Sequence, residues 1–249
     1  LGDTIRVSLT EDPEREYAPC NRLAEIAGAR LGDDAKVRQN AVPSFDDSRD
    51  FQSFARRSGR LPEQREGDDF DYRGLLNRDG SVLTAVTTEQ LQSPDALYAE
   101  LGCKTVVGLP FKDISTSDAI VLDTPPALDD DKGRQTLKRL MDVAILPIIP
   151  AAALAAAPVD GAVALLSLQE HLDGVTAPAC AGRTVVSIRG DETMDQLSAL
   201  KSLDHAFVLL DIPRNDLSGL HSSRRTFAAF EELGIDSSVV HVFRPPASD

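Results

Sequence analysis

Short apolar segments alternate with helix-like segments along most of this chain. Each apolar segment has the length of one buried strand, and together they cover residues 4–10, 81–86, 104–111, 118–122, 143–150, 183–190, 205–215 and 237–243. Between them, apolar residues recur at helical spacing over 23–32, 93–102, 133–142, 158–174, 191–203 and 224–234. Continuous apolar strands that alternate with helices are typical of a parallel sheet that is covered on both faces.

We therefore expect an α/β fold with a doubly wound, mostly parallel sheet and helices on both faces. A chain of 249 residues is long enough for one such domain, which we place over 1–249. Residues 32–80 depart from the alternation, because they are dense in Asp, Arg, Ser and Gln and contain few apolar anchors. There we predict a polar insertion or a partly mobile surface region.

Charge and composition exclude several classes of function. The formal net charge is −14, whereas binding to nucleic acid through phosphates needs a basic face, so we expect weak or no non-specific DNA binding. No apolar run approaches the length of a membrane span, so we expect no membrane association. Cys20, Cys103 and Cys180 are widely spaced, which argues against a disulfide framework and a structural zinc site. We predict a cytoplasmic location.

Chemistry in a parallel sheet gathers at the carboxyl ends of the strands. Three of the loops expected there carry distinctive residues: 11–16, 123–126 and 213–215. The most informative segment is AIVLDTPPAL, residues 119–128, an apolar strand that ends in Asp123 and continues with Thr124 and two prolines. An acid at this position can hold Mg²⁺ beside a phosphate group.

Three motifs occur in order along the second half of the chain: DTPP at 123–126, MDVAILP at 141–147 and LDIPRN at 210–215. In these motifs the chain resembles the ParA/MinD branch of deviant Walker ATPases, and ParA-type partition proteins most of all. The resemblance covers about half of the chain and implies a P-loop NTPase-like fold. The nucleotide-binding residues that it implies are Asp123, Thr124, Pro125, Arg214 and Asn215, with Asp123 as the magnesium ligand and catalytic acid of an ATPase. The DNA-binding residues that it implies are Arg224 and Arg225.

The same resemblance places the phosphate-binding loop of the family on residues 11–18, where its defining residues are missing. The segment EDPEREYA has no glycine and no lysine, and its proline removes a backbone donor. Carboxylates beside a phosphate also oppose its binding. We interpret this loop as degenerate over Glu11, Asp12, Pro13, Glu14, Arg15 and Glu16. The favoured hypothesis is a ParA-like pseudo-ATPase without a cofactor, acting as a scaffold or adaptor in plasmid or chromosome partition, conjugation or cargo positioning.

Two alternatives stay open. The protein could be a working ParA-type ATPase that binds Mg-ATP at an atypical site, or an unrelated doubly wound enzyme or small-molecule-binding protein. Under the favoured hypothesis we expect no enzymatic activity. We then expect a protein partner, such as a ParA-like, ParB-like or conjugation component, and a homodimer is compatible with the same hypothesis.

Overall fold

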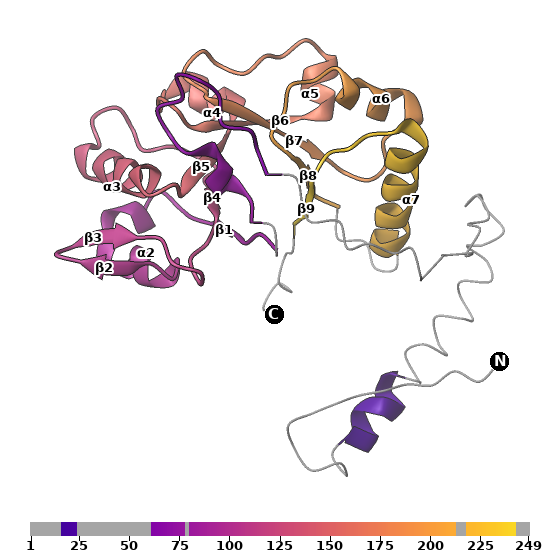
Figure 1. Ribbon diagram of the computed structural model, residues 1–249, viewed down its shortest axis with the longest axis horizontal. Coiled ribbons are helices and arrows are strands. Elements are labelled where there is room, and N and C mark those ends of the chain that lie inside the picture. Colours follow the sequence, from indigo (N-terminus) through magenta and orange to yellow (C-terminus); the bar gives the residue numbers. More distant parts are fainter. Residues whose placement is uncertain (1–15, 24–60, 78–79, 213–217, 243–249) are drawn as a thin grey trace. The chain divides into compact units, whose positions relative to one another are not determined.

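The computed structural model of the protein describes residues 16–23, 61–77, 80–212 and 218–242 (Figure 1). By the contacts between its residues, the chain divides into two compact units, 1–55 and 56–249. The described part of the first unit contains one short helix over 17–23, whose side chains are mostly exposed. The sequence pattern predicts a loop at these positions, whereas the strand predicted over 4–10 and most of the helix predicted over 23–32 lie outside the described residues.

Seven parallel strands form the sheet of the second unit. They are β1 (Leu83–Ala85), β4 (Ala119–Val121), β5 (Leu146–Pro150), β6 (Val163–Ser167), β7 (Arg183–Ile188), β8 (Val208–Leu210) and β9 (Val239–His241). Each pairs with its neighbours in parallel, and the order across the sheet is the order along the chain. The α/β class with a mostly parallel sheet is therefore confirmed. A doubly wound sheet reverses its strand order at one point, and these seven strands show no reversal.

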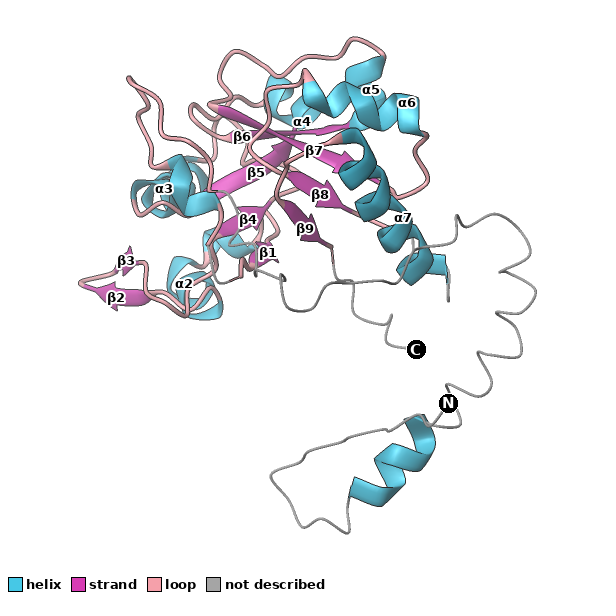
Figure 2. Ribbon diagram, turned by 45° about the vertical axis from the view of Figure 1, so that its right-hand side comes forward, coloured by secondary structure: helices cyan, strands magenta, loops and turns pink. Residues whose placement is uncertain are grey.

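Helices and one hairpin connect the strands. The α-helices of this unit are α2 (Pro94–Glu100), α3 (Asp131–Asp142), α4 (Ala151–Ala156), α5 (Leu168–Leu172), α6 (Met194–Ser198) and α7 (Ser218–Leu233). Short 3-10 turns lie at η2 (Tyr72–Leu75), η3 (Gln90–Gln92) and η4 (Ala199–Lys201), and the hairpin consists of β2 (Lys104–Val106) and β3 (Leu109–Phe111). Figure 2 shows a curled sheet, with α5, α6 and α7 along one side of it and the hairpin projecting beyond α2.

Successive residues of β7 and β8 alternate between two hydrophobic cores, as the two-residue period of a strand requires. Val186 and Val208 belong to a cluster that contains side chains of α6 and α7. The neighbouring Val185 and Leu209 belong to a larger cluster with β4, β5 and β6. Leu83 and Val240, from the two end strands of the sheet, both pack against that larger cluster, which is the consequence of the curl.

Two predicted elements differ from the structure. The helix predicted over 158–174 is wrong, because its first part forms β6 in the middle of the sheet and only Leu168–Leu172 is helical. A short apolar run fits both periods, and the helix start is set by a capping box in which Ser167 and Glu170 bond each other's backbone amides. The single strand predicted over 104–111 is a hairpin, because Val107 and Gly108 both have positive φ and turn the chain back.

Candidate functional site

The loops after β1 and β4 meet at the carboxyl edge of the sheet. The hydroxyl of Thr88 donates a hydrogen bond of 2.6 Å to the backbone carbonyl of Thr124. Asp123 and Thr124 are both exposed, and Asp123 makes no hydrogen bond or ion pair to a described residue. The following prolines, Pro125 and Pro126, are buried. Asp123 is therefore a free carboxylate on a proline-stiffened turn, at the edge where parallel sheets bind ligands.

The turn that carries Asp123 is held by the start of α3. The guanidinium of Arg134 donates to the carbonyls of Pro126, at 3.2 Å, and Pro158, at 2.5 Å. Asp130 caps α3 by accepting from the amide of Gly133 at 2.9 Å, and it also accepts from Gln92 at 2.7 Å. The bond from Gly133, followed by that from Gln92, lowers the pKa of Asp130. The hydrogen bond from Arg134 to Pro126 thus ties the turn at 123–126 to α3.

A second cluster lies where β7 ends. The carboxylate of Glu192 accepts from the backbone amides of Arg189, at 2.5 Å, and Gly190, at 2.8 Å. Arg225 of α7 donates to the carbonyl of Gly190 at 2.5 Å. The charged side chains of Glu192 and Arg225 therefore both bind the loop backbone. Arg224 and Arg225, the two predicted DNA-binding residues, are both exposed.

Several predicted site residues lie outside the described part of the chain. These are Arg214 and Asn215 and, from the supposed phosphate loop, Glu11, Asp12, Pro13, Glu14 and Arg15. Glu16 is described and lies at the start of the short helix of the first unit. The structure therefore does not bring the predicted nucleotide-site residues together: of that set it places Asp123, Thr124 and Pro125 only.

Among the described residues, no group of three or more His, Cys, Asp or Glu side chains could hold a metal ion. A centre held by thiolates needs several cysteines at one place. Here Cys20 lies in the helix of the first unit, Cys103 immediately before β2 and Cys180 before β7, and all three are free thiols. The described part of the chain therefore does not fit a metal centre held by several thiolates. No described helix is long and apolar enough to cross a membrane.

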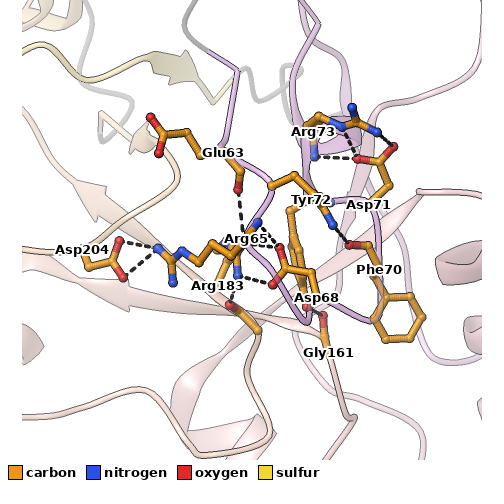
Figure 3. Close-up of polar contacts among 12 residues, drawn as sticks. Glu63, Arg65, Asp68, Phe70, Asp71, Tyr72, Arg73, Gly161, Arg183 and Asp204 are labelled. Atoms are coloured by element: carbon orange, nitrogen blue, oxygen red, sulfur yellow. Dashed lines mark hydrogen bonds and ion pairs between the residues drawn. The ribbon is translucent and has the colours of Figure 1, made fainter.

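The opposite, amino edge of the sheet is closed by the segment 61–77 (Figure 3). Arg183, the first residue of β7, forms a doubly hydrogen-bonded ion pair with Asp68, and both side chains are buried. The Arg183 guanidinium also donates to the carbonyls of Gly182 and Glu63, at 2.7 and 3.1 Å, and lies 4.3 Å from the centre of the Tyr72 ring. Burial by itself would raise the pKa of Asp68, but the bonds from Arg183 and from the Arg65 amide lower it.

A polar groove of about 420 Å³ lies beside this network, below the amino ends of β7, β8 and β9. An exposed pair between Arg65 and Asp204, with bonds of 2.7 and 2.8 Å, crosses it. The ring of His205 lies 2.9 Å from the hydroxyl of Ser237 and 2.8 Å from the carbonyl of Leu203. The guanidinium groups of Arg65 and Arg183 are already paired with carboxylates. The groove is therefore a weaker candidate for a ligand site than the carboxyl edge, because neither group is available to an anion.

Comparison with known proteins identifies close relatives. No family model matches the chain. It is 43% identical, over 97% of its length, to the chloroplastic 4-hydroxy-3-methylbut-2-en-1-yl diphosphate synthase (ferredoxin) of Arabidopsis thaliana. It is thus similar to a diphosphate synthase. The rice protein of the same name is 42% identical over the whole chain, and the flavodoxin-type synthase of Protochlamydia amoebophila is 32% identical over 58% of it. The chain spans about a third of the length of the two plant relatives.

These relatives overturn the resemblance to ParA/MinD proteins and the function inferred from it. A match over the whole chain outweighs three short motifs. Many parallel sheets can build a strand followed by a DTPP turn, whereas nucleotide binding needs the glycine-rich loop and the lysine, which this chain lacks at the aligned positions. The partition scaffold, the pseudo-ATPase, the atypical ATPase and the unrelated doubly wound enzyme are therefore wrong. The expected cofactor, none or Mg-ATP, is also wrong, since the relatives are named for ferredoxin or flavodoxin.

Sequence reasoning missed the residues that close the amino edge. Besides Arg183 and Asp68, these include Lys112, whose ammonium group donates to the carbonyls of Gly74, at 2.9 Å, and of Asp118 and Ala144, both at 3.2 Å. A signal was present, because Tyr72, Leu75 and Leu76 are closely spaced apolar residues within an otherwise polar stretch, and all three belong to the larger core.

Proposed function

We propose that this chain forms an α/β module of a 4-hydroxy-3-methylbut-2-en-1-yl diphosphate synthase, and that catalysis also needs the rest of such an enzyme. The observation that carries the proposal is the identity of 42–43% to two plant synthases, which extends over 97–100% of the chain. The same matches cover only about a third of those enzymes. A compact unit with its own buried core, such as 56–249, is what a module of a larger enzyme requires.

The geometry of this chain supports a division of roles within the enzyme. The amino edge of the sheet is occupied by a buried ion pair and the 61–77 segment, and the described residues do not gather ligands for a redox centre. Names that include ferredoxin and flavodoxin point to electron transfer. We assign that chemistry to the remaining two-thirds of the enzyme. For this chain we propose a positioning role, with the exposed turn of Asp123 as the part of the sheet's carboxyl edge that is open to a ligand.

The sheet also supports a more specific fold type. Parallel strands in chain order, in a curled sheet whose end strands share one core, support the wall of a barrel-like (β/α) arrangement. We propose this arrangement in place of the P-loop type.

The protein partner that we propose is the remainder of the synthase, together with ferredoxin or flavodoxin as its electron donor. Weak or absent DNA binding stays a prediction, and it rests on the net charge of −14. The cytoplasmic location also stays a prediction, and the names of the plant relatives place those proteins in the chloroplast.

The test is a segment exchange in living cells. The matching third of the Arabidopsis enzyme is replaced by this chain, and the hybrid is expressed in a bacterium that depends on a plasmid-borne synthase. We expect growth with the hybrid and none with an enzyme from which the segment is deleted. A hybrid that accumulates as folded protein without supporting growth would contradict the proposal, as would growth supported by this chain alone.

A further inference from the structure

The β2–β3 hairpin exposes an apolar face. In its register, Lys104 lies opposite Phe111, Thr105 opposite Pro110, and Val106 opposite Leu109. Opposite residues of an antiparallel pair point to the same side. In the middle pair Pro110 is buried and Thr105 is exposed, so the side of Pro110 is the one that faces the unit. The outer side therefore carries Lys104 together with three apolar residues, Val106, Leu109 and Phe111, which are 57%, 46% and 47% exposed.

The tip of the hairpin extends this face with a conformation that costs free energy. Val107 and Gly108 have φ of 51° and 74°, the signature of a two-residue type I′ turn. Asn or Gly is the usual residue at the first position, because β-branched side chains rarely adopt positive φ. Val107 nevertheless occupies it and is 97% exposed. Strained residues tend to persist at functional sites, which points to a use for this side chain outside the described fold.

The surroundings of the hairpin favour an apolar partner. Ile114, three residues beyond β3, adds a further apolar side chain that is 95% exposed. The charges at its base, Lys104 and Asp113, form an ion pair of 2.5 Å and so cancel each other. In the described part of the chain, β2 and β3 pair only with each other. Figures 1 and 2 both show the hairpin at the end of the unit that is far from β6–β9, where a partner can reach it.

We infer that the outer face of the hairpin, defined by Val106, Val107, Leu109, Phe111 and Ile114, docks onto an apolar surface of the remaining two-thirds of the synthase. This inference rests on the proposed function, since that function supplies the partner. The plant relatives are about three times as long as the segment that matches this chain, so that segment adjoins further domains in them. Contacts between domains of one enzyme bury substantial surface. A contiguous apolar face on a projecting hairpin is the kind of surface that such a contact covers.

The test uses amide hydrogen exchange in two proteins: this chain alone, and the hybrid in which it replaces the matching third of the Arabidopsis enzyme. If the hairpin docks, exchange of the amides over 104–111 is slower in the hybrid by roughly tenfold or more. Val107→Asn combined with Leu109→Thr removes two apolar contacts but installs the Asn-Gly pair that type I′ turns prefer. This variant should restore fast exchange in the hybrid without accelerating it in the chain alone, which separates lost docking from hairpin unfolding. Leu172→Gln, at an exposed leucine of α5, is the matched control and should change neither value.

Each outcome decides the inference separately from the proposed function. An active hybrid whose hairpin exchanges as fast as in the chain alone overturns the docking inference and leaves the proposed function standing. A folded hybrid with a protected hairpin but without synthase activity supports docking and contradicts the proposed function. Self-association of the chain alone that slows hairpin exchange and is lost in the double variant would assign the face to a second copy, which also overturns the inference.

Discussion

The buried ion pair between Arg183 and Asp68 offers the sharpest test of how the amino edge is held. The Arg183 side chain is 5% exposed and that of Asp68 is 10% exposed. Replacing Asp68 by Asn removes the only carboxylate that pairs with this guanidinium among the described residues, and leaves a buried cation with carbonyl partners alone. Breaking one half of a buried pair typically costs about 3–5 kcal/mol. For a unit of this size, that loss corresponds to a fall in Tm of roughly 10 °C.

The same edge provides a matched control. Arg65 and Asp204 form a pair of the same residue types with bonds of 2.7 and 2.8 Å, but their side chains are 50% and 76% exposed. Solvent screens such a pair, so Asp204→Asn should cost less than about 1 kcal/mol. Urea unfolding of Asp68→Asn, Arg183→Met and the double variant completes a cycle, in which the double variant should be more stable than the sum of the single losses predicts. Equal small losses for both aspartates, or strict additivity in the cycle, would refute this reasoning.

Three further predictions concern the same edge. Its hydrogen bonds lower the pKa of Asp68 below the ordinary value of 3.8, so the stability that this carboxylate contributes is present above about pH 4 and lost as the pH falls through the lowered pKa. Asp68→Asn should therefore flatten part of the acid limb of a stability–pH curve, and an unchanged limb would count against the role of Asp68. Burial lowers the pKa of Lys112, against the opposing effect of Asp118. Lys112→Met should lower the free energy of unfolding in urea by about 2–3 kcal/mol, because three carbonyls lose their donor. A loss within experimental error would show that water replaces the ammonium group. A Cβ at residue 182 would overlap the hydroxyl of the buried Tyr72, so Gly182→Ala should lower the free energy of unfolding by about 1–3 kcal/mol. An unchanged Tm in thermal unfolding would contradict this steric argument.

Six of the seven strands were predictable, because each is an apolar run of strand length with polar or helical segments on either side. Its strand order was not, since sequence alone does not determine which parallel strands become neighbours. The β6–α5 segment shows the limit most clearly: Val163 to Leu168 satisfies both a buried strand and a buried helix. The decision comes from the sheet, where β6 fills the gap between β5 and β7.

The amino-edge network could not be predicted, because its partners are far apart in the sequence. Arg183 and Asp68 are separated by 115 positions, and each is an ordinary charged residue in its local context. The polar composition of 32–80 predicted a surface region, yet over 61–77 polar side chains pair with the sheet and the apolar Tyr72 and Leu75 enter the core. At the carboxyl edge the local prediction was correct, because Asp123 is exposed at the end of a buried strand as its motif indicates. The family inferred from that motif was wrong, since four residues are too few to determine a family.

The central claim is that this chain is a module of a diphosphate synthase, and turnover by the purified hybrid tests it most directly. The hybrid, the parent Arabidopsis enzyme, the enzyme without the segment and this chain alone are assayed for diphosphate product with reduced ferredoxin. We predict a kcat for the hybrid within about tenfold of the parent, and for the deleted enzyme and the chain alone a rate at least roughly a thousandfold lower. A folded hybrid without turnover, or full turnover by the deleted enzyme, would contradict the claim.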